Sequence, residues 1–203
     1  MPAPIMIMDP ENPDMSQLAE AAGFLAAGGL IAFPTETYYG LAADYANPAA
    51  LERLAWAKGR EEEKPFALIL ASPAEAEQIA QCPPAAKELM AAHWPGPLTL
   101  VMRGRPGLCQ RLLGPGGMVG MRVSPHPVAA GLAAALGRAI TATSANPAGG
   151  APVMQARGLD PALAARLDLI IDAGPTPGGP ASTVAAVDES GEIKVLRPGA
   201  VEI

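Results

Sequence analysis

The chain of 203 residues is 50% hydrophobic and 17% charged, a composition that supports a buried core and argues against an intrinsically disordered protein. A net charge of −6 and a pI of about 4.9 argue against broad nucleic-acid binding, which usually requires a basic face. No apolar run approaches the roughly 18 residues that span a bilayer, and the N-terminus lacks a signal-peptide pattern, so we expect a cytoplasmic protein without a membrane segment.

Capping residues mark the beginnings of the expected helices. Asp14 followed by Gln17 has the pattern of a capping box. Asn47 and Ser72 are each followed by a proline at the expected first helical position. Glu75, three residues after Ser72, completes the cap pattern of the second of these helices. In chain order, we expect helices at residues 14–27, from 47 toward 58, from 72, at 84–93 and at 127–136.

Short apolar runs between these helices predict the strands. We expect strands at residues 30–33, 66–70, 98–102, 119–123, 139–142, 167–172, 183–187 and 193–196. Residues 188–191 would join the last two strands as an antiparallel hairpin, and the Gly- and Pro-rich stretch 174–180 would form a flap over a site. The pattern predicts one mixed α/β domain rather than a simple doubly wound sheet.

The few cysteines and histidines exclude several kinds of chemistry. Cys82, Cys109, His93 and His126 are the only residues of these types, and none lies in a ligand spacing typical of zinc. We therefore expect reduced, structural cysteines and no metal site built by the protein. Gly-rich stretches match neither the P-loop nor the dinucleotide-binding fingerprint, which disfavours a Walker-type ATPase or a Rossmann dehydrogenase.

Hydroxyl and cationic side chains gather where the expected elements end. Thr35 leaves the end of a strand, where it either lines a cleft or satisfies the backbone of a capped turn. Lys58, Arg60 and Lys64 follow the second helix, and three cations so close together suit phosphate groups. The glutamates between them favour the alternative of a solvated charge run.

A second group of polar residues follows later strands. Arg122 ends an apolar strand, where a charge requires either an acidic partner or an anionic ligand, and we weight the two equally. Ser144 and Asn146 follow the strand at 139–142 and either bind an oxyanion or form a local turn. His126 is either a helix cap or a ligand contact. Together the clusters predict a site for phosphates and a carboxylate.

Seven segments, in this order, resemble the YrdC family, the threonylcarbamoyl-AMP synthases. They are Pro34-Thr35-Glu36-Thr37-Tyr38-Tyr39-Gly40-Leu41, Ala57-Lys58-Gly59-Arg60, Trp94-Pro95-Gly96-Pro97-Leu98-Thr99, Arg122 with His126-Pro127, Ser144-Ala145-Asn146, Ser182-Thr183-Val184 and Leu196-Arg197-Pro198-Gly199. The resemblance implies a single YrdC-like domain over residues 1–203, with its motifs between about 15 and 203, in the short form without an additional C-terminal domain.

The resemblance also implies a fold and a reaction. The expected fold is α/β, a YrdC-like twisted mixed sheet with flanking helices around a large open cavity. The expected enzyme is a nucleotidyltransferase that joins L-threonine, bicarbonate and ATP into L-threonylcarbamoyladenylate and releases pyrophosphate. Its product would feed the threonylcarbamoyl-adenosine modification of tRNA through downstream tRNA threonylcarbamoyl-transferase proteins, with at most weak tRNA contact by this chain.

Site residues follow from the resemblance by position. The threonine would be contacted by Thr35, Arg122, Ser144 and Ser182, the nucleotide by Arg60, Lys64 and Arg197, and the catalytic set would be Lys58, Arg60, Ser144 and Asn146. Mg²⁺ would accompany ATP. An alternative function is a non-catalytic RNA- or nucleotide-binding module of the same fold. A carbamoyl-transfer domain of hydrogenase-maturation proteins is disfavoured, because the zinc-finger and acylphosphatase-like segments expected there are absent from the sequence.

Overall fold

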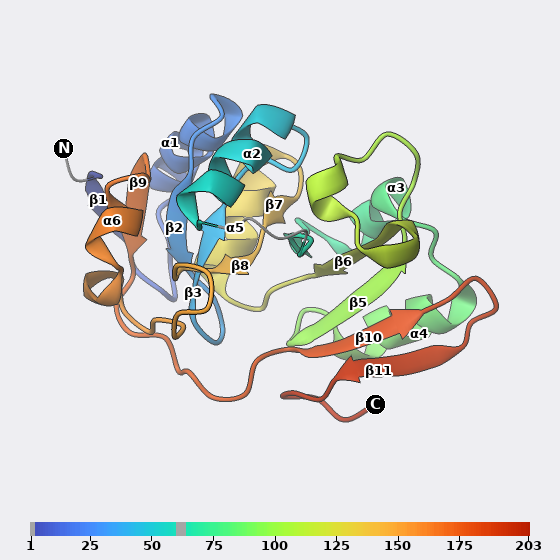
Figure 1. The fold of residues 1–203 in the computed structure, drawn as a ribbon. Helices are drawn as coiled ribbons and strands as arrows, with labels where there is room; N and C mark the ends of the chain where they lie inside the picture. Colours follow the sequence, from blue (N-terminus) through green and yellow to red (C-terminus); the bar gives the residue numbers. More distant parts are fainter. Residues whose placement is uncertain (1–2, 60–63) are drawn as a thin grey trace.

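The computed structural model describes residues 3–59 and 64–203, which form two β-sheets flanked by helices (Figure 1). The strands are β1 (Ile5–Ile7), β2 (Ile31–Pro34), β3 (Tyr39–Ala42), β4 (Leu68–Ile69), β5 (Leu98–Arg103), β6 (Met118–Arg122), β7 (Ile140–Thr141), β8 (Thr143–Ser144), β9 (Leu169–Asp172), β10 (Thr183–Val187) and β11 (Ile193–Arg197). The α-helices are α1 (Met15–Ala26), α2 (Pro48–Ala57), α3 (Ala76–Ile79), α4 (Pro84–His93), α5 (Pro127–Leu136) and α6 (Pro161–Ala164). The expected mixed α/β class is confirmed.

Each sheet mixes parallel and antiparallel neighbours. The five-stranded sheet has the order β1-β9-β2-β3-β8, with β9 parallel to β1 and β2, and β3 antiparallel to β2 and β8. The six-stranded sheet has the order β11-β10-β5-β6-β4-β7, with parallel pairs β10–β5 and β4–β6. Figure 1 shows the two sheets in separate halves of the molecule, with the C-terminus beside β11. The hairpin expected at residues 188–191 is confirmed as the antiparallel pair β10–β11.

Local capping signals placed most helices correctly. The bounds expected for α4 and α5 are those observed, because Pro84 and Pro127 each stand at a first helical position. Asp14 caps α1 by accepting hydrogen bonds from the backbone nitrogens of Ser16 and Gln17. Gln17 does not complete the capping box. Its side-chain amide instead donates to the carbonyl of Ile7, 3.1 Å away, and so ties α1 to β1.

The helix expected from Ser72 differs from the prediction. Ser72 makes no side-chain cap hydrogen bond, Pro73–Glu75 form a 3₁₀ turn, and α3 adds only four residues. The difference is caused by a tertiary contact of Glu75. The buried carboxylate of Glu75 accepts from the backbone nitrogens of Ala71 at 2.9 Å and Ala139 at 2.6 Å, so it joins two separate segments instead of capping one helix.

Three strands and one short helix, namely β1, β3, β8 and α6, were not expected from the sequence. The strand expected at residues 139–142 is shorter than predicted: β7 ends at Thr141, which pairs with Leu68 in the six-stranded sheet. The chain then joins the five-stranded sheet, where Thr143 pairs with Leu41. The segment expected to be a loop after that strand therefore begins as β8. Strands of two residues have no periodicity to detect, and pairing with a distant partner defines them.

Helices α1 and α5 pack together over one face of the five-stranded sheet. Their buried side chains include Leu18, Leu25, Val128 and Leu132, which form a core with the apolar residues of β2 and β9. Gly131 permits the close approach, because a Cβ atom there would lie 2.6 Å from Leu18 Cδ1. Burial of each large aliphatic side chain of this kind contributes about 1.5–3 kcal/mol. The core thus fixes the sheet that carries the β2–β3 turn.

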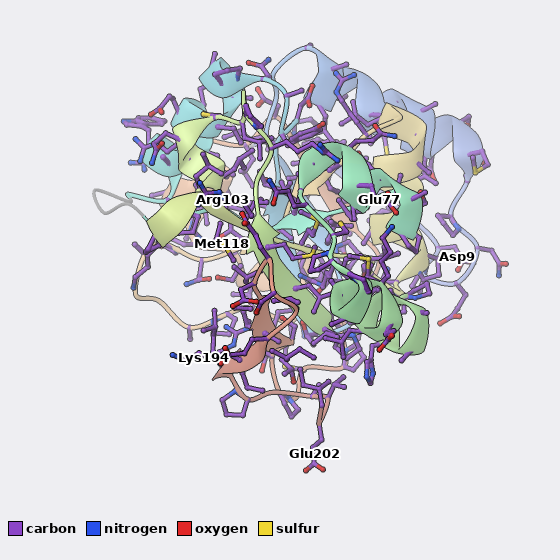
Figure 2. All side chains as sticks on the ribbon, turned by 90° about the vertical axis from the view of Figure 1, so that its right-hand side faces the viewer. Asp9, Glu77, Arg103, Met118, Lys194 and Glu202 are labelled. Atoms are coloured by element: carbon purple, nitrogen blue, oxygen red, sulfur yellow. The ribbon has the colours of Figure 1, made fainter. Side chains whose placement is uncertain are left out.

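The six-stranded sheet ends at the exposed edge strand β11. All five residues of β11 are exposed, and Figure 2 shows Lys194 on this strand and Glu202 projecting from the C-terminal end. At the start of β5, which β10 separates from β11, the indole nitrogen of Trp94 donates to the carbonyl of Leu98 at 2.7 Å. No helix among residues 3–59 and 64–203 is long and apolar enough to cross a membrane.

Candidate binding pocket between the two sheets

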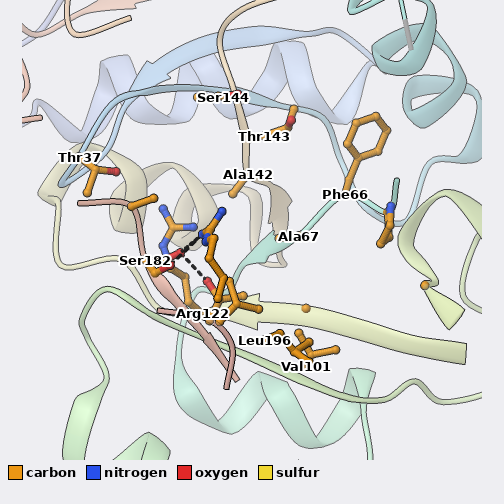
Figure 3. A pocket seen from close by; sticks show the side chains of 18 of the residues that line it. Thr37, Phe66, Ala67, Val101, Arg122, Ala142, Thr143, Ser144, Ser182 and Leu196 are labelled. Carbon is orange, nitrogen blue, oxygen red and sulfur yellow. Dashed lines mark hydrogen bonds between the residues drawn. The ribbon is translucent and has the colours of Figure 1, made fainter. Parts of the chain in front are cut away.

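A pocket of ≈ 710 Å³ lies between the two sheets (Figure 3). The five-stranded sheet contributes the β2–β3 turn and the strands β3 and β8, and the six-stranded sheet contributes residues of β5, β6, β10 and β11. Figure 3 shows side chains from both sheets in the pocket, including Thr143, Val101 and Leu196. The polar side chains that line it include Thr35, Thr37, Thr99, Arg122, Thr143, Ser144, Ser182 and Arg197.

Thr35 holds the turn between β2 and β3. Its hydroxyl donates to the carbonyl of Tyr38 at 2.7 Å and lies 3.3 Å from the backbone nitrogen of Thr37, from which it accepts. Both alternatives left open by the sequence therefore apply to Thr35, since it satisfies the turn and also lines the pocket. The turn is further tied to the segment at 174–180, because the hydroxyl of Tyr38 donates to the carbonyl of Gly179 at 2.8 Å and Gly178 N donates to the carbonyl of Thr37.

Arg122 has an acidic partner and faces the pocket. Its Nε donates to Glu36 Oε1 at 3.1 Å, and the two side chains are only 9% and 12% exposed. The second oxygen, Glu36 Oε2, accepts from Ser124 Oγ at 2.5 Å. A buried cation requires such compensation, because desolvation of a lone charge costs several kcal/mol. The acidic partner comes from the β2–β3 turn, so the ion pair links the two walls of the pocket.

Lys58 and Asn146 lie beside the pocket and do not belong to its lining. Lys58 is buried, and its Nζ donates to the carbonyls of Ser144 at 2.5 Å and Asn146 at 2.8 Å. The side-chain nitrogen of Asn146 donates to the carbonyls of Pro147 at 2.9 Å and Gly150 at 2.6 Å. These bonds fix the backbone directly after β8. Among the described residues no group donates to Asn146 Oδ1, although this oxygen is buried.

Ser182 stands at the rim with its hydroxyl in a hydrogen-bond network. Arg197 Nη2 donates to the carbonyl of Ser182 at 2.8 Å and to its hydroxyl at 3.2 Å, and Thr99 Oγ1 lies 3.0 Å from Ser182 Oγ. The C-terminal segment closes over the same residues: Ala200 N donates to the carbonyl of Ala181 at 3.0 Å. A Cβ atom at Gly199 would lie 2.3 Å from that carbonyl oxygen, so only glycine fits there.

Lys64 lies in a second hollow. This pocket, of ≈ 700 Å³, is also lined by Glu52, Gln110, Arg111 and the residues 113–117, and it shares Gly114 and Pro115 with the first pocket. Arg111 pairs there with Glu52 at 2.8 Å. The expected nucleotide contact Arg60 lies outside the described residues. The structure thus brings together Thr35, Arg122, Ser144, Ser182 and Arg197 around one pocket and places Lys64 in its neighbour.

Neither Tyr39 nor His126 offers a base to the pocket. Burial raises the pKa of Tyr39 to about 12, and its neutral hydroxyl donates to the carbonyl of Gly174 at 2.8 Å. His126 is the N-cap of α5, since its Nδ1 accepts from Val128 N at 3.2 Å, and burial holds the pKa of His126 below its usual value. The cap interpretation of His126 therefore accounts for its position.

Glu36 and Thr99 make contacts with expected site residues that were not predicted from the sequence: Glu36 pairs with Arg122, and Thr99 contacts Ser182. Both lie inside segments that carried the resemblance, at Pro34-Thr35-Glu36-Thr37 and Leu98-Thr99. Glu36 and Arg122 belong to different sheets, whereas Thr99 lies on β5 and Ser182 directly precedes the neighbouring strand β10, so only the folded structure identifies these partners. Within residues 3–59 and 64–203, no group of three or more His, Cys, Asp or Glu side chains is arranged to hold a metal ion.

Comparison with known proteins gives consistent matches. The model of the Sua5/YciO/YrdC family, described as "Telomere recombination", matches residues 23–199. A threonylcarbamoyl-AMP synthase of Bacillus subtilis is 36% identical over 187 residues, which cover 91% of this chain and 54% of that protein. The chain therefore spans about half the length of this relative.

Two solved structures have a similar fold. Sua5 of P. abyssi complexed with L-threonine superposes with a TM-score of 0.86 at 34% identity, covering 96% of this chain and 57% of that one. YciO of E. coli superposes with a TM-score of 0.88 at 26% identity, covering 98% of this chain and 97% of that one. The match to YciO extends over nearly the whole of both chains.

Proposed function

This chain belongs to the Sua5/YciO/YrdC family, and from that premise we propose that it is a threonylcarbamoyl-AMP synthase, which joins L-threonine, bicarbonate and ATP and releases pyrophosphate. The observation that carries the proposal is the convergence of Thr35, Arg122, Ser144 and Ser182, from four separate segments, on one pocket. These are the side chains that the resemblance assigns to threonine. The relative from P. abyssi that was crystallised with L-threonine supports the same substrate.

The polar residues of the pocket suit an amino acid. Arg122 keeps its Nη groups without a hydrogen-bond partner among the described residues, and a guanidinium binds a carboxylate through two parallel hydrogen bonds. Ser144 and Ser182 add hydroxyls that can donate to or accept from the substrate. Apolar side chains such as Val101 and Leu196 provide the surface on which less polar parts of the ligands rest.

The nucleotide is proposed to extend from this pocket toward the second hollow. Lys64 lies there, and the two hollows share Gly114 and Pro115, so a molecule as long as ATP can reach from one to the other. Arg197 at the rim and Arg60 would add two further cations in this proposal. The described residues offer no carboxylate cluster for Mg²⁺, a pattern that fits an ion held mainly by phosphate oxygens and water. Magnesium bound in this way would neutralise the charge of the triphosphate.

The reaction needs positioning more than proton transfer. Bicarbonate condenses with the neutral threonine amine to give an N-carboxylate and one molecule of water. One oxygen of the N-carboxylate then attacks the α-phosphorus of ATP as the bond to the pyrophosphate oxygen breaks. Two anions must approach each other, so the cations that flank them lower the barrier by offsetting their repulsion. An N-carboxylate is already anionic and needs no general base at this step, which agrees with the neutral Tyr39 and the capping role of His126.

The cellular role is part of the same proposal. The product would be passed to tRNA threonylcarbamoyl-transferase proteins in the cytoplasm, for modification of tRNA. Direct contact with tRNA would be weak at most, because the net charge of −6 disfavours a polyanion.

Release of pyrophosphate by the purified chain tests the proposal. We expect release only when ATP, L-threonine and bicarbonate are all present, and loss of the signal when any one is omitted or when L-serine replaces L-threonine at the same low concentration. Turnover of ATP that does not depend on threonine would contradict the proposal. Calorimetric binding of ATP without any pyrophosphate release would instead favour the non-catalytic binding module.

A further inference from the structure

The contact between Arg122 and Glu36 leaves part of the guanidinium unused. Glu36 accepts from Nε alone, at 3.1 Å, and neither Nη group donates to a residue in the described part of the chain. A guanidinium offers two pairs of parallel N–H donors, one that includes Nε and one formed by the two Nη groups. Because Glu36 occupies Nε, the pair that stays available for a carboxylate is the one formed by Nη1 and Nη2.

Ser124 keeps the second oxygen of Glu36 from binding an Nη group of Arg122. The hydroxyl of Ser124 donates to Glu36 Oε2 at 2.5 Å, so the two carboxylate oxygens have different donors. The hydroxyl donates in this bond because a carboxylate oxygen can only accept, and the Ser124 oxygen in turn accepts from the backbone nitrogen of His126 at 3.2 Å. Ser124 is 1% exposed, and water does not compete for its hydroxyl. The carboxylate is therefore held in one orientation.

The two partners come from different walls of the pocket. Glu36 belongs to the turn between β2 and β3, which the Thr35 hydroxyl holds in shape, while Arg122 is the last residue of β6. Glu36 is not among the residues that line the pocket, whereas Arg122 is. The Glu36 side chain contacts one residue that does, Arg122, and this contact is the route by which we expect Glu36 to affect a ligand.

We propose that Glu36 is a positioning residue for carboxylate recognition: supported by Ser124, it holds Arg122 so that the Nη pair faces the carboxylate of the amino-acid substrate. The inference rests on the proposed function, in which that substrate is L-threonine. A purely structural role for the pair predicts a loss of stability that affects all ligands equally. A positioning role predicts a loss confined to the ligand that carries the carboxylate.

Two substitutions separate these roles. Glu36→Ala removes both hydrogen bonds of the carboxylate, whereas Glu36→Gln keeps an oxygen that can accept from Arg122 Nε. We expect Glu36→Ala to weaken L-threonine binding, measured by calorimetry, at least tenfold and to change ATP binding less than twofold. Glu36→Gln should stay within about threefold of the wild type for both ligands. The matched control is Glu77→Ala, which removes a carboxylate from the exposed pair with Lys87; neither residue lines either pocket.

Thermal denaturation identifies variants that fail to fold, and Ser124→Ala provides a second route to the same test. Without the Ser124 proton, Glu36 can rotate and clamp Arg122 with both oxygens, so L-threonine binding should weaken although the ion pair remains. Equal weakening of L-threonine and ATP binding by Glu36→Ala, or unchanged L-threonine binding, would overturn the inference. A wild-type chain that binds L-threonine but releases no pyrophosphate would overturn only the proposed function.

Discussion

The two walls of the pocket present different kinds of groups. The five-stranded sheet contributes hydroxyls and backbone from the β2–β3 turn and β8 and no cation, whereas the six-stranded side contributes an apolar surface, the hydroxyls of Thr99 and Ser182, and both arginines, Arg122 and Arg197. The two arginines also differ from each other: Arg122 is buried and paired with Glu36, and Arg197 lies on the exposed edge strand β11. The charge of Arg122 is thus held in place by Glu36 inside the protein, whereas the charge of Arg197 lies at the solvent-exposed rim.

This difference indicates how much each of the two arginines contributes to ligand affinity. A cation at low exposure interacts strongly with a ligand anion, because little water screens it, but it must be compensated while the pocket is empty. Glu36 provides that compensation from the opposite wall. An exposed cation such as Arg197 needs no compensation and contributes less to affinity.

Replacing the buried arginine should have the largest effect. Arg122→Ala removes the proposed carboxylate contact and leaves Glu36 as a buried charge without its cation. We expect the threonine-dependent rate of pyrophosphate release to fall by about 100-fold or more and the free energy of unfolding to fall by about 3 kcal/mol. Steady-state kinetics and urea denaturation measure the two effects. Arg122→Lys, which keeps the charge but lacks the planar pair of donors, should recover stability more than rate.

A smaller loss is expected at the rim, where the C-terminal segment covers Ser182. A Cβ atom in Gly199→Ala would lie 2.3 Å from the carbonyl oxygen of Ala181, so the backbone at residues 181–183 must move. We expect the threonine-dependent rate to fall about tenfold as the Ser182 hydroxyl is displaced, a loss of about 1.4 kcal/mol in transition-state stabilisation. Gly23→Ala in α1, where an added Cβ meets nothing within 4 Å, is the matched control. A rate loss shared by both variants would contradict the assignment.

The smallest effect should appear behind the pocket, at the cap of α5. Burial lowers the pKa of His126, so the neutral ring that accepts from Val128 N is favoured in the folded state. Its contribution is complete above the usual pKa of about 6.5 and is lost as the pH falls through the lowered pKa. His126→Asn keeps a cap acceptor and removes the titration. We expect this variant to lose less stability than the wild type between neutral and mildly acidic pH in urea denaturation, and equal losses would contradict the prediction.

A helix, strand or contact could be predicted from the sequence where the interaction that defines it is local in the chain. The bounds of α4 and α5 could be predicted because a proline at the first helical position is a signal within the element itself. The two-residue strand β8 could not, since it is defined by its pairing with β3 about a hundred residues earlier in the chain. The charge at Arg122 was recognised as needing compensation, but only the fold identifies Glu36 as the residue that supplies it.

The candidate site follows the same rule. The resemblance grouped Thr35, Ser144 and Ser182 correctly around one pocket, because conserved order along a family's fold carries spatial information that a single residue does not. Lys58 was expected to act in catalysis. In the structure its Nζ donates to the carbonyls of Ser144 and Asn146, which lie 86 and 88 residues further along the chain, so no local sequence pattern predicts these hydrogen bonds. Its catalytic assignment stays a prediction.

The crossing of the chain from one sheet to the other constrains how the pocket can open. Thr141 is hydrogen-bonded within one sheet and Thr143 within the other, with Ala142 as the sole residue between them. One residue spans at most about 3.6 Å, so the sheets cannot separate at this point without breaking strand pairs. The two sheets are therefore tied together on either side of Ala142, at the β7 end of the six-stranded sheet, whereas β11 with Arg197 lies at the opposite end of that sheet.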